Sequence, residues 1–229
     1  MELWKTAVLV PCFRRPEYTA KCLRALEQAQ DYPSTTFLLV DDGSRDGTEQ
    51  LLLASKLPKE VIVRDGSLGL RHTLVEFVEW ALQGRYEILG VIGNDCLVPP
   101  DWLNQITLGL MTTTAEIISP NVMPSNAAFT YGEPDRDGLG YRPSQTIGGL
   151  WFMRRRLIEG IRFERAELRG IAGATGILER IILECEPRIG WLPEVVVQDL
   201  GHWSGDHPLH VKSDEHRAYS REVGRSVAW

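Results

Sequence analysis

Short apolar runs alternate with segments of helical periodicity through the first half of the chain. The runs are three to five residues long and rich in β-branched side chains, which is typical of strands buried on both faces. They lie at residues 6–10, 37–40, 61–63 and 88–92, and Pro11 is expected to end the first. Between them, apolar residues three and four apart predict helices at about 16–30, 48–53 and 70–82. This alternation predicts βαβ crossovers and a parallel sheet covered by helices on both faces.

The second half of the chain has a different pattern, because the regular alternation lapses at about residue 112. Residues 120–143 are rich in Pro, Gly, Asn and Asp, the composition of a long loop of the kind that often acts as a lid. Beyond it we expect a strand at 146–153, a helix at about 176–185 and a strand at 194–197. We expect one domain over residues 1–229, with a Rossmann-like half at 1–110.

Composition and charge narrow the class of protein. Hydrophobic residues make up 43% of the chain and charged residues 24%, values that fit a globular fold and not a disordered chain. The formal net charge of −6 argues against a general polyanion-binding surface. The richest basic run is Arg154 to Arg156, and a solvated face or strand end explains it more simply than a phosphate clamp.

Cysteine usage and the N-terminal residues indicate a compartment. The four cysteines are widely spaced without a CxxC pair, which indicates neither a zinc ribbon nor a disulfide scaffold. Reduced thiols fit a cytosol, so we expect a cytoplasmic protein. The N-terminus runs directly into an expected strand, and no apolar run approaches 18 residues. Neither secretion nor a transmembrane segment is therefore expected.

Polar loops follow three of the expected strands. CFRR at 12–15 follows the first, DDGS at 41–44 the second and GNDC at 93–96 the fourth. In open parallel sheets, ligands bind beyond the carboxyl ends of the strands. These three loops are therefore expected to converge on one crevice.

The acidic pair after the second strand has two interpretations. Asp41 and Asp42 can accept hydrogen bonds from a base imide and from ribose hydroxyls. The structural alternative is an Asx turn, with Ser44 or Asp46 capping the next helix. Both interpretations can hold together.

The acidic residue after the fourth strand also has two interpretations. Asp95 is a hard anionic ligand, well placed to hold Mg²⁺ or Mn²⁺ against a diphosphate. A strand-end turn is the structural alternative. Asp101 is better explained as the cap of a helix that begins near Trp102.

Three segments together resemble the family 2 glycosyltransferases. They are VPCFRRPEY at 10–18, VDDGSRDGT at 40–48 and NDCLVPPDWL at 94–103, and the resemblance covers about half the chain. Members of this family have the GT-A fold, in which a parallel nucleotide-binding sheet is joined to an acceptor-binding half. The resemblance implies an α/β GT-A fold, with a mostly parallel central sheet flanked by helices. It also implies that residues 1–110 bind a nucleotide sugar and that the mixed half at 111–229, with its C-terminal tail, binds an acceptor.

The resemblance implies roles for residues of the first two loops. The Pro11 backbone and Asp42 would hold the nucleobase, with Asp41 close by. Cys12 and Arg14 lie in the same donor-binding loop. Arg14 stands where a small polar residue is usual in the family.

Later motifs of the first half supply further donor ligands by the same resemblance. Asn94 would face the ribose and Asp95 would ligate the metal, whereas Gly93 occupies the first acidic place of the family's DxD-type motif. Arg71, in GSLGLR at 66–71, matches a loop whose arginine can contact the nucleotide. A solvated residue in the first helical turn is the alternative for Arg71.

The second half carries weaker matches. IGGLWFMRR at 147–155 resembles the strand that backs the acceptor site, and PEVVVQDLGH at 193–202 resembles the strand that delivers a histidine towards the donor phosphates. His202 is therefore the candidate second metal ligand. His207 and His210 with Asp206 would also allow a small zinc cluster, although the thiolate pairs typical of structural zinc are missing.

The general base is the place where the resemblance fails. Inverting members commonly use an aspartate from an acidic pair before a helix to deprotonate the acceptor hydroxyl. Residues 170–176 read GIAGATG here and contain no acidic pair. Glu164, Glu167 and Glu179 are the nearest substitutes. We assign Glu167 as the base, beside Asp95 as the other catalytic residue.

The expected activity is glycosyl transfer from a nucleotide sugar, first of all a UDP-sugar, to an acceptor hydroxyl with inversion and with Mn²⁺ or Mg²⁺. The acceptor would be a glycan, a protein, a lipid-linked glycan or a modified nucleobase. One alternative is a non-catalytic sugar-nucleotide-binding module, which the missing acidic pair and Gly93 would suit. Another is a sugar-phosphate nucleotidyltransferase, although its usual glycine-rich loop does not match PCFRRPEY.

Overall fold

The computed structural model describes residues 4–29, 34–123, 140–141, 150–159, 161, 181 and 184–200. The strands in this part of the chain are β1 (Thr6–Cys12), β2 (Thr35–Asp41), β3 (Lys59–Val63), β4 (Ile88–Val91), β5 (Cys96–Leu97), β6 (Ile117–Met123), β7 (Gly140–Tyr141), β8 (Trp151–Arg154) and β9 (Ile189–Asp199). The helices are α1 (Pro16–Gln28), α2 (Thr48–Ala54), α3 (Leu70–Gln83) and α4 (Trp102–Thr112), with a 3₁₀ turn η1 (Arg155–Leu157). Every strand and helix expected between residues 6 and 92 is present.

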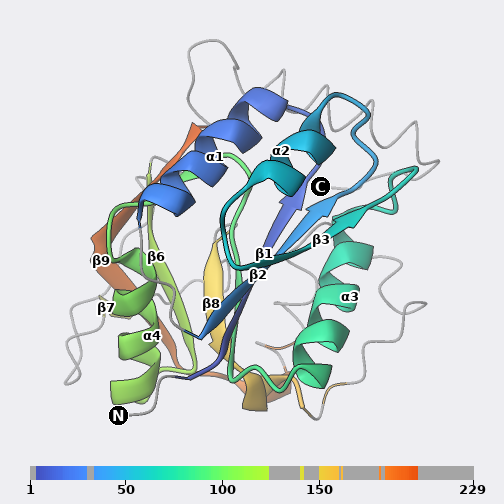
Figure 1. Ribbon diagram of the computed structural model, residues 1–229. Helices are drawn as coiled ribbons and strands as arrows, with labels where there is room; N and C mark the ends of the chain where they lie inside the picture. The colour runs from blue at the N-terminus through green and yellow to red at the C-terminus, as the bar shows by residue number, and fades with distance from the viewer. Residues whose placement is uncertain are drawn as a thin grey trace, which may run out of the picture.

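All nine strands belong to one mixed sheet in the order β3-β2-β1-β4-β8-β6-β9-β5, with β7 paired to β9 (Figure 1). Strands β3, β2, β1 and β4 are parallel to their neighbours. Beyond β4 the sheet is mixed, because β8 is antiparallel to β4 and β6 while β6 and β9 are parallel. The predicted division into a parallel half and a mixed half is confirmed.

The two faces of the sheet are covered by different helices, as the alternation of side chains in β1 shows. Val8 and Val10 pack in one core with residues of α1, α2 and α4. Ala7 and Leu9 point the other way, into a core formed with α3. Figure 1 shows α1 beside α2 on one side of the strands and α3 on the other. Both faces of β1 are therefore shielded from solvent, which explains its uninterrupted apolar sequence.

The first strand continues two residues past its expected end at Val10, through Pro11 to Cys12. Leu9 accepts a hydrogen bond from Ile92 N on the β4 side, whereas Cys12 accepts one from Asp42 N on the β2 side. Since successive residues face alternate neighbours, the ring nitrogen of Pro11 faces the β4 side. The β1–β4 ladder ends at Leu9, so no ladder bond is lost at Pro11.

The expected loop at 120–143 begins later than the sequence predicted. Strand β6 includes residues 120–123, and its pairing with β9 shifts register between Pro120 and Asn121. A proline is tolerated in a strand at such a bulge, where the hydrogen-bond ladder is already interrupted. Residues 124–139 and 142–149 lie outside the described part of the chain.

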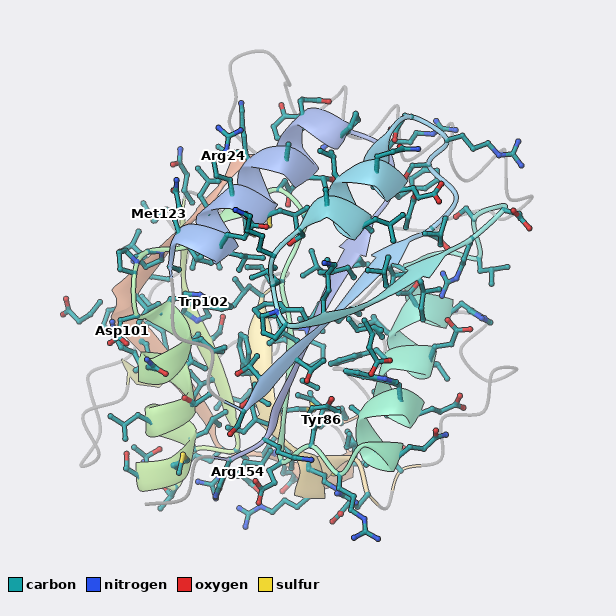
Figure 2. All side chains as sticks on the ribbon, viewed as in Figure 1. Arg24, Tyr86, Asp101, Trp102, Met123 and Arg154 are labelled. Carbon is teal, nitrogen blue, oxygen red and sulfur yellow. The ribbon has the colours of Figure 1, made fainter. Side chains whose placement is uncertain are left out.

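Asp101 occupies the expected position at the start of α4 but does not cap it as expected. Its backbone is left-handed with φ 60°, and its carboxylate accepts a hydrogen bond from the Asn104 side chain at 2.7 Å instead of from a backbone N–H. The next residue, Trp102 (Figure 2), is fully buried. Its ring meets the Phe152 ring edge-on, with the ring centres 5.5 Å apart. Packing of Trp102 therefore anchors this helix start.

Candidate functional site

The loops after β1, β2 and β4 meet at one edge of the sheet, which we call the carboxyl rim. Asp42 N donates to Cys12 O at 2.9 Å, and Arg14 N donates to the Ser44 hydroxyl at 2.8 Å. Burial raises the pKa of the Cys12 thiol, and the charges of Asp41 and Asp95 raise it further. Because β1, β2 and β4 are parallel, the loops that carry Cys12, Asp41 and Asp95 all begin at this edge, as the expected convergence requires.

The loop after β1 is strained. Arg14 and Arg15 both have left-handed backbones, with φ of 57° and 60°. Each costs about 1–2 kcal/mol in a residue with a side chain. The Ser44 hydroxyl holds this loop through Arg14 N, and the exposed Arg14 guanidinium lies 4.9 Å from the centre of the Phe13 ring. Strain of this kind gathers at ligand sites, where surrounding contacts maintain it.

Asp41 has the structural role that the Asx-turn interpretation predicted. It is buried, and its Oδ1 accepts a hydrogen bond from Ser44 N at 2.9 Å. Asp46 is the residue that serves the start of α2, because its Oδ1 accepts from Thr48 N at 3.1 Å and from the Thr48 hydroxyl at 2.6 Å. Ser44 instead holds the loop after β1.

Asp42 is buried and has four hydrogen-bond donors, all from the segment after β3. Oδ1 accepts from Arg64 and from Leu68 N at 3.0 Å, and Oδ2 accepts from the Ser67 hydroxyl and from Gly69 N at 2.9 Å. Four donors match the acceptor capacity of a carboxylate. A nucleobase that binds Asp42 would therefore replace one of these partners or share an oxygen with it.

Arg64 is a residue that the sequence did not single out. It directly follows β3, and its guanidinium contacts Asp42, the Thr73 hydroxyl at 2.7 Å and Glu76. Nothing in the local pattern distinguishes an arginine at a strand end from a solvated one, so no sequence signal marks it. Arg71 lies on the first turn of α3, where its contact with a nucleotide stays a prediction.

The loop after β4 rests on α1. The Asn94 amide donates to the Thr19 hydroxyl at 2.9 Å, and the Cys22 thiol donates to Gly93 O at 3.5 Å. From the other side, Leu200 N donates to Asp95 O at 2.9 Å, just after β9 ends. The loop that carries Asp95 is thus tied to α1 on one side and to the end of β9 on the other.

Gly93 lies directly beside the Asp95 carboxylate. A Cβ atom at this position would lie 2.7 Å from Asp95 Oδ1, far inside contact distance. The Asp95 carboxylate therefore occupies the space that a side chain at position 93 would need. The first acidic residue of the DxD-type motif is therefore missing at a position where its side chain would overlap the Asp95 carboxylate as placed.

Two buried cysteines, Cys22 and Cys96, lie at the loop that carries Asp95. Burial, followed by the charge of Asp95, raises the pKa of Cys22 to about 12. The same two causes raise the pKa of Cys96 well above its ordinary value, and the charge of Asp199 adds to them. At neutral pH these thiols therefore stay protonated.

The described residues fit a divalent cation in part. No group of three His, Cys, Asp or Glu side chains in the described ranges is arranged to hold a metal ion. Mg²⁺ often takes only one or two protein carboxylates together with substrate phosphates. Asp95 suits that role, with Asp199 opposite Cys96 in the β5–β9 ladder. His202 and Glu167 lie outside the described residues, as do Glu164, Glu179 and the zinc alternative Asp206, His207 and His210.

The arginine run at 154–156 is a structural feature. Arg154 pairs with Ile88, so it lies at the amino end of β4, away from the carboxyl rim (Figure 2). Its guanidinium donates to the Leu110 and Thr113 carbonyls at the end of α4. Arg155 pairs with Glu159 and Arg156 with Glu116. The interpretation as a strand end holds, and the run lies away from the donor loops.

Solved structures define the class of fold. A mannosyltransferase, PcManGT from Pyrobaculum calidifontis in complex with GDP-Man and Mn²⁺, superposes with a TM-score of 0.69 at 18% identity, over 100% of this chain and 66% of that one. TarS 1-349 of S. aureus with UDP-GlcNAc gives 0.65 at 16%, over 87% and 59%. GalNAc-T7 with UDP, GalNAc and Mn²⁺ gives 0.66 at 11%, over 89% and 45%. The chain has the GT-A glycosyltransferase fold and spans two thirds or less of these proteins.

The family follows from the sequence itself. The model of the family described as Glycosyl transferase family 2 matches residues 7–185, well over half of the chain, so this protein belongs to that family. A comparison with curated proteins gave no match. Among the described helices, none is both long enough and apolar enough to cross a membrane.

Proposed function

We propose that this protein transfers a sugar from a nucleotide sugar to an acceptor hydroxyl, with inversion and with a divalent cation. The observation that carries the proposal is the position of the Asp95 carboxylate, which lies beside Gly93 at the carboxyl rim, where the parallel strands that lead to Asp41, Asp42 and Asp95 end together. Family membership and the nucleotide sugars named with similar structures support it.

The proposed donor site comprises the residues expected from the sequence. Those that would contact the nucleotide are Pro11, Cys12, Arg14, Asp41, Asp42, Arg71 and Asn94. Asp95, with His202, would hold Mn²⁺ or Mg²⁺ at the diphosphate. Residues 1–110 would bind the donor and residues 111–229 the acceptor, within a single domain.

The proposed mechanism has two parts, one at the leaving group and one at the nucleophile. The cation, when bound, would neutralise charge that develops on the departing nucleoside diphosphate. Asp95 would orient that end of the donor. Glu167 would take the proton from the acceptor hydroxyl as it attacks from the opposite face of the sugar.

The donor and acceptor are proposed only by class. A UDP-sugar is the first choice of donor, since uridine nucleotides are named with two of the similar structures. The acceptor would be a glycan, a protein, a lipid-linked glycan or a modified nucleobase. Cys12, Cys22 and Cys96 are buried free thiols, which fits the proposed cytoplasmic location.

A thermal-shift screen of nucleoside diphosphates and their sugars with Mn²⁺ tests the donor, followed by a turnover assay with the best ligand. The proposal expects a rise in melting temperature that needs the cation, and release of the nucleoside diphosphate. Calorimetric binding without any product would favour the non-catalytic binding module. Release of pyrophosphate from a nucleoside triphosphate and a sugar phosphate would favour the nucleotidyltransferase.

A further inference from the structure

Arg64 connects the nucleobase end of the proposed donor site to helix α3. Its backbone N donates to Asp41 O at 3.0 Å, so the residue is fixed directly beside the acidic pair. Its side chain is only 8% exposed, and so is the Asp42 side chain that it contacts. A buried arginine at a strand end requires charged and polar partners, because an unpaired buried charge is costly.

The partners of Arg64 form a chain of charged groups. One terminal nitrogen contacts both Asp42 Oδ1 and the Thr73 hydroxyl, and the other contacts Glu76 Oε2. The second oxygen of Glu76 lies 2.9 Å from His72 Nε2. The pKa of Glu76 is lowered by its bonds to Arg64 and His72, which outweigh the opposing effect of its partial burial. The guanidinium is therefore held from both ends.

The geometry constrains how Asp42 can meet a ligand. With Arg64 and Leu68 N on Oδ1 and Gly69 N on Oδ2, the carboxylate plane is set by three donors that belong to one short segment. The fourth donor is the Ser67 hydroxyl, on a partly exposed side chain with a rotatable O–H. A base N–H can take the place of Ser67 without disturbing the other three.

We propose that Arg64 is a positioning residue for the nucleobase: it orients the Asp42 carboxylate so that a base N–H replaces the Ser67 hydroxyl on Oδ2. The inference rests on the proposed function, because it takes Asp42 as the group that contacts the base. A lysine at position 64 keeps the charge, but it lacks the planar fork that spans Asp42 and Glu76.

The test compares two ligands on the full-length protein by calorimetry. Uridine diphosphate and inorganic pyrophosphate are each titrated with Mn²⁺ into wild type, Arg64→Lys, Glu76→Gln and Arg24→Lys. Arg24 is exposed on α1 and serves as the matched control (Figure 2). Arg64→Lys is expected to weaken the binding of uridine diphosphate by about 10-fold, the loss that follows when a partner that orients a metal ligand is removed. Pyrophosphate affinity should stay unchanged, because it involves no base.

The remaining variants separate positioning from folding. Glu76→Gln leaves the Arg64–Asp42 pair in place and should weaken uridine diphosphate less, so it carries the test if Arg64→Lys does not fold. Equal affinity of Arg64→Lys and wild type for uridine diphosphate would overturn the inference. A parallel loss of both ligands would overturn it too, since it would indicate general damage to the site. If wild type binds no nucleoside diphosphate at all, the proposed function fails first and the inference fails with it.

Discussion

The two ends of the proposed donor site are built in different ways. At the nucleobase end, the loop after β2 is joined to residues 64–69 by four donors on the Asp42 carboxylate and by close backbone contact between Gly43 and Gly66. At the diphosphate end, the loop after β4 is anchored through its Asn94 amide and backbone carbonyls, to α1 and to Leu200. At the nucleobase end the Asp42 carboxylate itself joins the two loops. At the diphosphate end the described contacts that hold the loop come from the Asn94 side chain and from backbone carbonyls.

This difference indicates that the two ends of the proposed site have different functions. Hydrogen bonds to a charged group are about twice as strong as neutral ones, so the nucleobase end is rigid before a ligand arrives. Around Asp95 the nearby thiols of Cys22 and Cys96 are neutral, so they add no negative charge of their own. A preorganised base site and a charged diphosphate site are what transfer from a nucleotide sugar requires.

The largest expected effect comes from removing the charge at the diphosphate end. Asp95→Asn is expected to lower turnover by about 10²–10³-fold, the usual loss when one group that stabilises transition-state charge is removed. Asp101→Asn is the matched control, because Asp101 contacts Asn104 and Asn tolerates its left-handed backbone. Steady-state rates of donor turnover at saturating Mn²⁺ measure both, and equal rates would remove Asp95 from the mechanism.

Gly43→Ala is expected to destabilise the fold at the nucleobase end through a steric clash. Gly43 and Gly47 both have positive φ, so either change to Ala costs about 1–2 kcal/mol of backbone strain. At Gly43 the new Cβ would also lie 2.7 Å from the Gly66 backbone, which adds about 1–3 kcal/mol of overpacking. Urea denaturation should therefore rank Gly43→Ala below Gly47→Ala in free energy of unfolding. The reverse order would mean that the contact between the two loops is loose.

Gly93→Ala should disturb the diphosphate end without unfolding the protein. The added Cβ forces the Asp95 carboxylate out of its position, which is expected to raise the Mn²⁺ concentration for half-maximal activity by about 10-fold. Gly66→Ala is the control, because a Cβ there meets no atom within 4 Å. A metal titration of activity distinguishes them. An unchanged requirement in Gly93→Ala would show that Asp95 binds the cation from another position.

The smallest expected effect is a pH dependence at the nucleobase end. The pKa of Glu76 is lowered from its ordinary value of 4.5, so its contribution to stability is present above pH 4.5 and is lost as the pH falls through the lowered pKa. Glu76→Gln should be less stable than wild type at pH 7, and the difference should shrink towards pH 3. Urea midpoints across this range provide the measurement, with the exposed Glu79→Gln as control. A difference that does not change with pH would argue against the ion pair.

The parallel half was predictable because its signals are local. Apolar runs such as residues 6–10 and 37–40 identify strands buried on both faces, and the order of strands and helices then requires crossovers. The structural effect of the prolines was predicted less well. Pro11 continues a strand because β4 ends before it, and Pro120 is accommodated at a bulge against β9. Both outcomes depend on where a neighbouring strand stops or shifts, which local sequence does not contain.

The sequence by itself determined the order of elements, the family and which loops carry the acidic residues, because strand ends and turn residues are encoded by nearby positions. Only the tertiary structure decided what each carboxylate does. Asp41 and Asp42 are adjacent, yet one closes a turn with Ser44 and the other holds residues 64–69 through Arg64. The physical reason is that a carboxylate's role is set by the donors within about 3 Å of its oxygens. For Asp42 those donors come from residues 22 to 27 positions away in the sequence.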